Sequence, residues 1–123
     1  APSARGARSP GRPPGSGVSI DAGTVVAGFS LIGDHVRIGR RVAVGHHADI
    51  GRYSTIHPGA VISGHSRIGE QVTIGTGAVI VDRIEIGDGS FIAAGAVVTK
   101  RVPPRALVAG NPGRIVRQDY GPK

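Results

Sequence analysis

The chain has 123 residues, the size of a single domain, and a formal net charge of +7. It contains 21 glycines, no cysteine, methionine or tryptophan, and only two tyrosines and two phenylalanines. The lack of cysteine excludes disulfide bonds, thiolate metal sites and a cysteine nucleophile, and so few aromatic residues cannot fill an ordinary globular core. No apolar run approaches the roughly 20 residues of a membrane span, so we expect a cytoplasmic protein without membrane contacts.

The composition divides the chain into three parts. Residues 1–17 are rich in proline, glycine, serine and arginine, which predicts a disordered basic tail. Residues 18–103 are periodic and form the predicted folded domain. Residues 104–123 contain proline, glycine and scattered arginines, and we interpret them as a short C-terminal cap.

The middle part repeats every six residues. From Ile20 to Val98, each sixth residue is isoleucine or valine, fourteen positions without one insertion. The residue four places after each is serine, threonine, alanine or valine, with Ile84 as the exception. Neither an amphipathic helix nor strand alternation produces this period, whereas hexapeptide repeats of parallel β-helices do. We therefore predict an all-β fold, a parallel β-helix of about four to five coils.

If three hexapeptides form one coil, residues 18 apart lie above one another, and one face of the prism carries most of the polar chemistry. Two neighbouring rows on it are His47, His65, Arg83, Arg101 and His46, Gly64, Asp82, Lys100. Coils about 4.8 Å apart make each row roughly 15 Å long. Such a line suits an extended ligand with a reactive tip and a phosphorylated tail. The alternative is that long polar residues only coat the surface, and stacking alone leaves both open.

Two segments carry a resemblance to a known family. The stretch "VGHHADIGRYSTIHPG" (residues 44–59) and the ending "GAVVTKRVP…VAGNP" resemble the hexapeptide acyltransferases, whose β-helix is left-handed. Within them the chain is most similar to the sialic acid O-acetyltransferase (NeuD) and UDP-amino-sugar N-acetyltransferase (PglD) group, over about residues 24–117. The resemblance implies a homotrimer that moves an acetyl group from acetyl-CoA, bound between subunits, to an amine or hydroxyl of a sugar.

The resemblance also implies roles for individual residues. His46 falls on the family's catalytic histidine, a general base, and the backbone N–H of Gly64 falls on the oxyanion donor. Transfer is direct, so no cysteine is required. The residues implied in binding acetyl-CoA are Thr55, Gly64, His65, Arg83, Lys100 and Arg101.

The chain departs from the family pattern in three places. His47 stands where the group has an acidic residue that orients the base, which leaves Asp49 or a residue of the next subunit as substitute. Thr55 replaces a histidine that contacts the acetyl donor, and its hydroxyl can still donate a hydrogen bond. The group also carries an N-terminal Rossmann-like domain that holds the nucleotide sugar, whereas this sequence shows only the basic tail there.

Two other function classes are open. A β-helix of this kind can be a non-catalytic trimeric scaffold. Gamma-class carbonic anhydrases share the fold and bind zinc, and by resemblance they need two histidines five residues apart. The histidines here stand at 35, 46, 47, 57 and 65, so we expect no metal and interpret His35 and His57 as surface groups. Without an aromatic-lined basic groove, we also expect no nucleic-acid binding.

Overall fold

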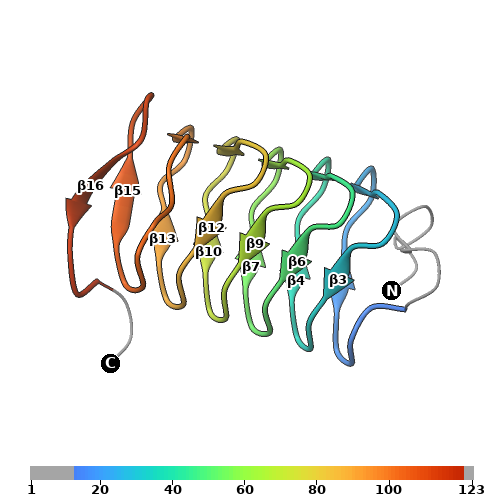
Figure 1. Cartoon of the computed structure of the whole chain (residues 1–123). Helices are drawn as coiled ribbons and strands as arrows, with labels where there is room; N and C mark the ends of the chain where they lie inside the picture. Colours follow the sequence, from blue (N-terminus) through green and yellow to red (C-terminus); the bar gives the residue numbers. More distant parts are fainter. Residues whose placement is uncertain (1–12, 121–123) are drawn as a thin grey trace.

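The computed structural model describes residues 13–120, which wind along one axis as a prism of short parallel strands (Figure 1). Each strand before β15 is two residues long, and the chain turns after it. Three strands make one coil, and the coils follow one another in chain order from one end of the prism to the other (Figure 1). The predicted all-β fold, a parallel β-helix of about four to five coils, is thus confirmed. Residues 13–120 contain no helix, and so none that is able to cross a membrane.

The strands of the described range form three sheets, one on each side of the prism. The seven-stranded sheet contains β1 (Ser19–Ile20), β4 (Arg37–Ile38), β7 (Thr55–Ile56), β10 (Thr73–Ile74), β13 (Phe91–Ile92), β15 (Leu107–Ala109) and β16 (Arg114–Arg117). The five-stranded sheet contains β2 (Val25–Val26), β5 (Ala43–Val44), β8 (Val61–Ile62), β11 (Val79–Ile80) and β14 (Val97–Val98). The four-stranded sheet contains β3 (Leu31–Ile32), β6 (Asp49–Ile50), β9 (Arg67–Ile68) and β12 (Glu85–Ile86).

The six-residue repeat fills the interior of the prism. In each two-residue strand the first side chain faces outward and the second, the repeated isoleucine or valine, is buried. The small residue four places later is buried as well, in all thirteen cases including Ile84. Strands pair in parallel with residues 18 apart as partners, for example Ala43 with Val61. Branched aliphatic side chains therefore stack on their counterparts, which explains why the core needs no large aromatic residue.

Glycine after the buried aliphatic residue has a steric cause. A Cβ atom at Gly45 would come within 2.8 Å of the Gly64 Cα atom and closer still to its backbone nitrogen. Gly33 and Gly51 are crowded in the same way by the backbone of the following coil. At these three positions a side chain would fit only if the next turn moved away.

The two ends of the β-helix depart from the strict repeat. Near the C-terminus the step between coils shortens from 18 to 16 residues, because Ile86 pairs with Val102 and Ile92 with Val108. The antiparallel strand β16 then folds back on β15. At the other end, the N–H of Gly15 donates to the Ile32 carbonyl at 2.9 Å. Contacts between coils therefore extend beyond the predicted range 18–103 on both sides, and residues 1–12 of the predicted tail lie outside the described residues.

Candidate active site

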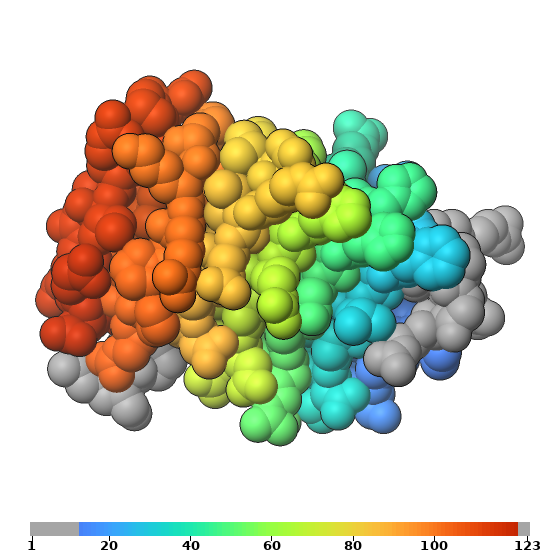
Figure 2. Space-filling model, viewed as in Figure 1, coloured from blue at the N-terminus to red at the C-terminus, as the bar shows by residue number. Residues whose placement is uncertain are grey.

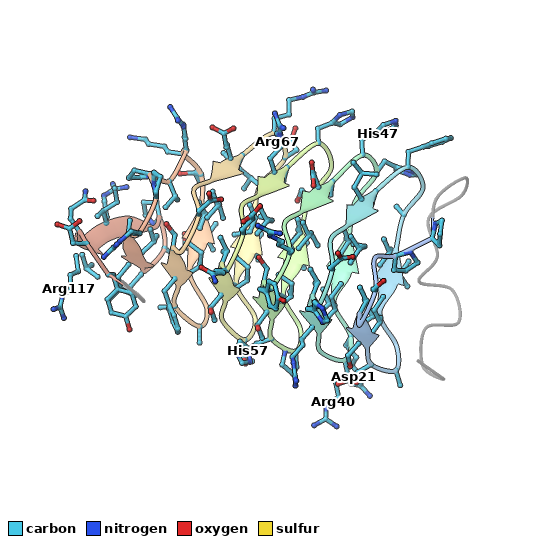
Figure 3. All side chains as sticks on the ribbon, turned by 90° about the horizontal axis from the view of Figure 1, so that it is seen from below. Asp21, Arg40, His47, His57, Arg67 and Arg117 are labelled. Atoms are coloured by element: carbon cyan, nitrogen blue, oxygen red, sulfur yellow. The ribbon has the colours of Figure 1, made fainter. Side chains whose placement is uncertain are left out.

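The turns between the five-stranded and four-stranded sheets stack along one edge of the prism, which we call the histidine corner. It comprises residues 28–29, 46–47, 64–65, 82–83 and 100–101. In Figure 2, protruding side chains of successive coils follow one another along the molecule, coloured from cyan to yellow. His47 lies on this edge, whereas His57 lies on the opposite side of the prism (Figure 3).

His46 is exposed on this corner and has a glycine on either side of it along the row. Gly28 occupies its position in the preceding coil, and Gly64 in the following one. Backbone hydrogen bonds hold the three turns in line: the His47 N–H donates to the Gly28 carbonyl at 3.2 Å, and the His65 N–H to the His46 carbonyl at 2.8 Å. Because glycine has no side chain, a ligand can reach the imidazole along the corner from both directions.

Gly64 presents a free backbone donor next to this histidine. Its carbonyl accepts a hydrogen bond from the Arg83 N–H at 3.0 Å, but its own N–H has no acceptor among residues 13–120. A Cβ atom at Gly64 would lie 3.2 Å from the His46 carbonyl oxygen, so the two turns approach closely. An unpaired backbone N–H is the kind of donor that can stabilise an oxyanion.

The second residues of these turns form a stack of aromatic rings. The His47 and His65 rings are stacked with centroids 4.9 Å apart and planes 4° apart. Phe29 stacks on the other side of His47, at 5.3 Å and 17°. All three residues have positive φ, between 57° and 63°, a backbone region that is uncommon for residues other than glycine. The rings therefore stand in one line beside His46.

The hydroxyl of Ser30 binds both ends of the turn that carries His46. Its Oγ donates to the Gly45 carbonyl at 2.8 Å and accepts from the Ala48 N–H at 3.3 Å. Ser30 is 1% exposed, so these bonds do not compete with water. A buried side chain from the preceding coil thus fixes the backbone on either side of His46 and His47.

Cationic side chains gather at the C-terminal end of the corner, as predicted. Lys100 and Arg101 line a hollow of about 380 Å³ that is closed on its other side by Arg114 and Ile115 of β16. Arg101 also pairs with Glu85 at 3.0 Å, and Arg83 lies 3.9 Å from Asp82. Lys100 has no ion-pair partner in the described part of the chain. This end of the corner suits a negatively charged ligand.

Two residues considered from the sequence lie away from the corner. Thr55 is the outward residue of β7, in the seven-stranded sheet, which does not border the histidine corner. Asp49 points outward from β6 into a hollow over the four-stranded sheet, lined among others by Arg67 and Glu85. Within the described residues Asp49 makes no ion pair with a histidine, and a substitute acid for His46 therefore remains a prediction.

The remaining histidines form no metal site. His35 stacks on Tyr53 at 4.9 Å, on the edge between the four-stranded and seven-stranded sheets. Over residues 13–120, no group of three histidine, aspartate or glutamate side chains is arranged to hold a metal ion.

Sequence reasoning missed three residues of this region: Phe29, Ser30 and Arg114. The 18-residue register places Phe29 one coil before His47 in the same row, so the sequence could have predicted that Phe29 lies there. Ser30 appeared only as a small core residue, because the register does not show where a hydroxyl points. Arg114 lies beyond the repeat, where no periodic pattern locates a side chain.

The six-residue repeat of this β-helix matches a known family. The family model for the bacterial transferase hexapeptide (six repeats) matches residues 29–64 and 65–100. The chain belongs to this family. No curated protein sequence matches it.

Solved structures of sugar acetyltransferases have the same fold. PerB from Caulobacter crescentus, a perosamine N-acetyltransferase solved with CoA and GDP-perosamine, is 30% identical with a TM-score of 0.86, over 89% of this chain and 53% of that one. The acetyltransferase domain of PglB from Neisseria gonorrhoeae, solved with acetyl coenzyme A, is 36% identical with a TM-score of 0.85, over 88% and 53%. The chain thus spans about half the length of both. AntD from Bacillus cereus, an N-acyltransferase, is 16% identical with a TM-score of 0.79, over 85% of this chain and 71% of that one, and shows the fold alone.

Proposed function

We propose that the protein transfers an acetyl group from acetyl-CoA to the amine of a nucleotide-linked amino sugar. The observation that carries the proposal is the row Gly28, His46, Gly64, in which an exposed imidazole stands next to a free N–H donor with space on both sides. The two similar structures support the substrates, since one holds CoA with GDP-perosamine and the other acetyl coenzyme A.

His46 acts as the general base in this proposal. The acceptor nitrogen attacks the thioester carbonyl carbon while His46 takes a proton from it, and the Gly64 N–H stabilises the oxyanion of the tetrahedral intermediate. The carbon–sulfur bond then breaks, His46 returns the proton to the leaving sulfur, and the products are the N-acetyl sugar and free CoA. One imidazole serves both transfers, because its neutral form accepts the proton and the imidazolium that results gives it up.

The donor lies on the C-terminal side of His46 in this proposal. Its thioester is placed over Gly64 and beside His65, and its phosphates run toward Arg83, Lys100 and Arg101. Charge supports the direction, because the hollow at that end brings Lys100, Arg101 and Arg114 together. Arginine and lysine are the usual partners of phosphate groups.

We further propose that the active unit is a trimer. The outward residues of the five-stranded sheet are all apolar: Val25, Ala43, Val61, Val79 and Val97. The four-stranded sheet instead presents Leu31, Asp49, Arg67 and Glu85. A contiguous apolar face on a soluble protein commonly marks a subunit contact. Thr55 lies on another side of the prism, so it meets the donor in this proposal only if the neighbouring subunit supplies it.

The test is CoA release from acetyl-CoA with GDP-perosamine and UDP-linked amino sugars as acceptors. We expect wild-type turnover with at least one of them and a loss of about 10²- to 10⁴-fold in kcat for His46→Ala. His57→Ala, an exposed histidine on the opposite side, is the matched control and should retain activity. Undiminished turnover by His46→Ala would contradict the mechanism, and failure to bind acetyl-CoA would favour a non-catalytic scaffold.

A further inference from the structure

The N-terminal end of the histidine corner exposes an aromatic side chain. Phe29 is 63% exposed and has a φ of 63°. Positive φ is the regular conformation of this turn position, which other residues such as His35 and Tyr53 share, so the backbone does not distinguish Phe29. Its exposure does, because a phenylalanine in contact with water gains little from burial. This exposure points to a role outside the stability of the fold.

Phe29 is followed by a second exposed apolar residue. Leu31 lies two places later, on β3, and is 37% exposed. We call Phe29 and Leu31 the apolar shelf. Because the Phe29 ring stacks on His47 at 5.3 Å, and His47 stacks on His65, the shelf is held at a fixed place relative to the turn that carries His46.

The shelf lies on the side of His46 that the donor leaves open. Cationic groups stand on the C-terminal side, whereas Gly28 leaves the N-terminal side of the imidazole without a neighbouring side chain in its row. Phe29 is one coil away in that direction, and one coil corresponds to roughly 4.8 Å. A group that takes the row position next to Gly28 therefore lies beside Phe29 and close to His46.

We propose that the apolar shelf contacts the pyranose ring of the acceptor while the amine on that ring meets His46. The inference rests on the proposed function and adds a determinant of acceptor specificity. Phe29 contacts the sugar, and His47 and His65 act as positioning residues that support its ring.

The first experiment compares KM values for GDP-perosamine and acetyl-CoA in Phe29→Ala. We expect about a tenfold rise in KM for the sugar nucleotide, with kcat and the KM for acetyl-CoA nearly unchanged. Phe29→Tyr, which keeps the ring face, should retain the wild-type KM. His35→Ala is the matched control, since it removes a ring from a similar stack at the same turn position on another edge, and its KM should not change.

A second variant and a binding measurement separate the sugar from other occupants. Gly28→Val fills the N-terminal side of His46, and we expect it to abolish acceptor binding while acetyl-CoA still binds. By calorimetry, Phe29→Ala should bind GDP-perosamine more weakly than the wild type does, whereas its affinity for GDP should be unchanged. Three results for Phe29→Ala would contradict the role of the shelf: equal loss of affinity for GDP-perosamine and GDP, an unchanged KM for GDP-perosamine, or a changed sedimentation mass. Turnover by the wild type would still support the proposed function in each case. If wild type neither binds nor acetylates any amino-sugar nucleotide, the proposed function itself fails, and the shelf with it.

Discussion

Buried hydroxyl groups hold the turns of this β-helix, and they do so by a repeated pair of hydrogen bonds. In four cases, Thr24, Ser30, Ser54 and Ser90, the side-chain oxygen donates to a carbonyl of the next coil and accepts from an N–H a few residues later. Each hydroxyl therefore binds the two ends of one turn. Since buried backbone groups are costly to leave unpaired, these serines and threonines stabilise the turns themselves.

Ser30 and Ser54 form a matched pair that separates stability from catalysis. Ser54 binds the turn 69–72 with bonds of 2.8 and 3.1 Å, as Ser30 binds the turn of His46. Removing either hydroxyl leaves buried polar groups unpaired, so we expect both alanine variants to lose about 1–3 kcal/mol in the free energy of unfolding. In Ser30→Ala, kcat should also fall several-fold, because the turn of His46 loosens.

Urea unfolding and steady-state kinetics on both variants check this prediction. Ser54→Ala should keep the kcat of wild type below its unfolding transition. Equal losses of kcat in the two variants would mean that the hydroxyl of Ser30 has no particular relation to the site.

At the level of elements, the repeat predicts strands and turns but not the cap. The six-residue period located β1 to β14, because each strand consists of an outward residue and the repeated aliphatic residue. It fails at Val102 and Val108, where the step between coils shortens to 16 residues and the count of six loses its register. The antiparallel strand β16 has no counterpart in the repeat, and so the hollow it forms with Lys100 was not foreseen.

The hollow between the histidine corner and β16 leads to a prediction about the binding of acetyl-CoA. Lys100 is exposed there without an ion-pair partner among the described residues, so a bound phosphate is its natural counterion. We expect Lys100→Ala to raise the KM for acetyl-CoA about fivefold, which corresponds to roughly 1 kcal/mol for a solvent-exposed charge contact. The rise should shrink at high salt, because exposed charges are screened.

Kinetics at low and high ionic strength check the role of Lys100. Arg40→Ala removes an exposed cation from the opposite side of the prism and should leave this KM unchanged (Figure 3). A larger effect from Arg40 than from Lys100 would place the phosphates elsewhere.

For the whole molecule, the register predicts which residues share an edge but not which side chains face a neighbour. Stacking of His47 on His65 follows from their separation of 18 residues. Thr55 belongs to the same coil as His46, yet the prism places it on another side, and no pattern within one chain shows what a second chain brings to it. The part of the site that depends on assembly is therefore the part that the sequence of one chain does not define.

The apolar outward face of the five-stranded sheet leads to a prediction about subunit assembly. Val61 lies at the middle of this face and is 37% exposed. A carboxylate there must be desolvated when subunits meet, so we expect Val61→Asp to sediment as a monomer while wild type sediments as a trimer. If each site needs residues from two subunits, the monomer should also lose acetyl transfer.

Arg67→Ala is the charge-matched control, because it also makes the chain one unit more negative but lies on the polar four-stranded sheet. Its sedimentation mass and turnover should remain those of wild type. Circular dichroism on Val61→Asp distinguishes loss of assembly from loss of fold, since the outward position leaves the buried isoleucine stack intact. A folded, monomeric Val61→Asp with full kcat would show that one prism carries the whole site, and Thr55 would then have no part in it.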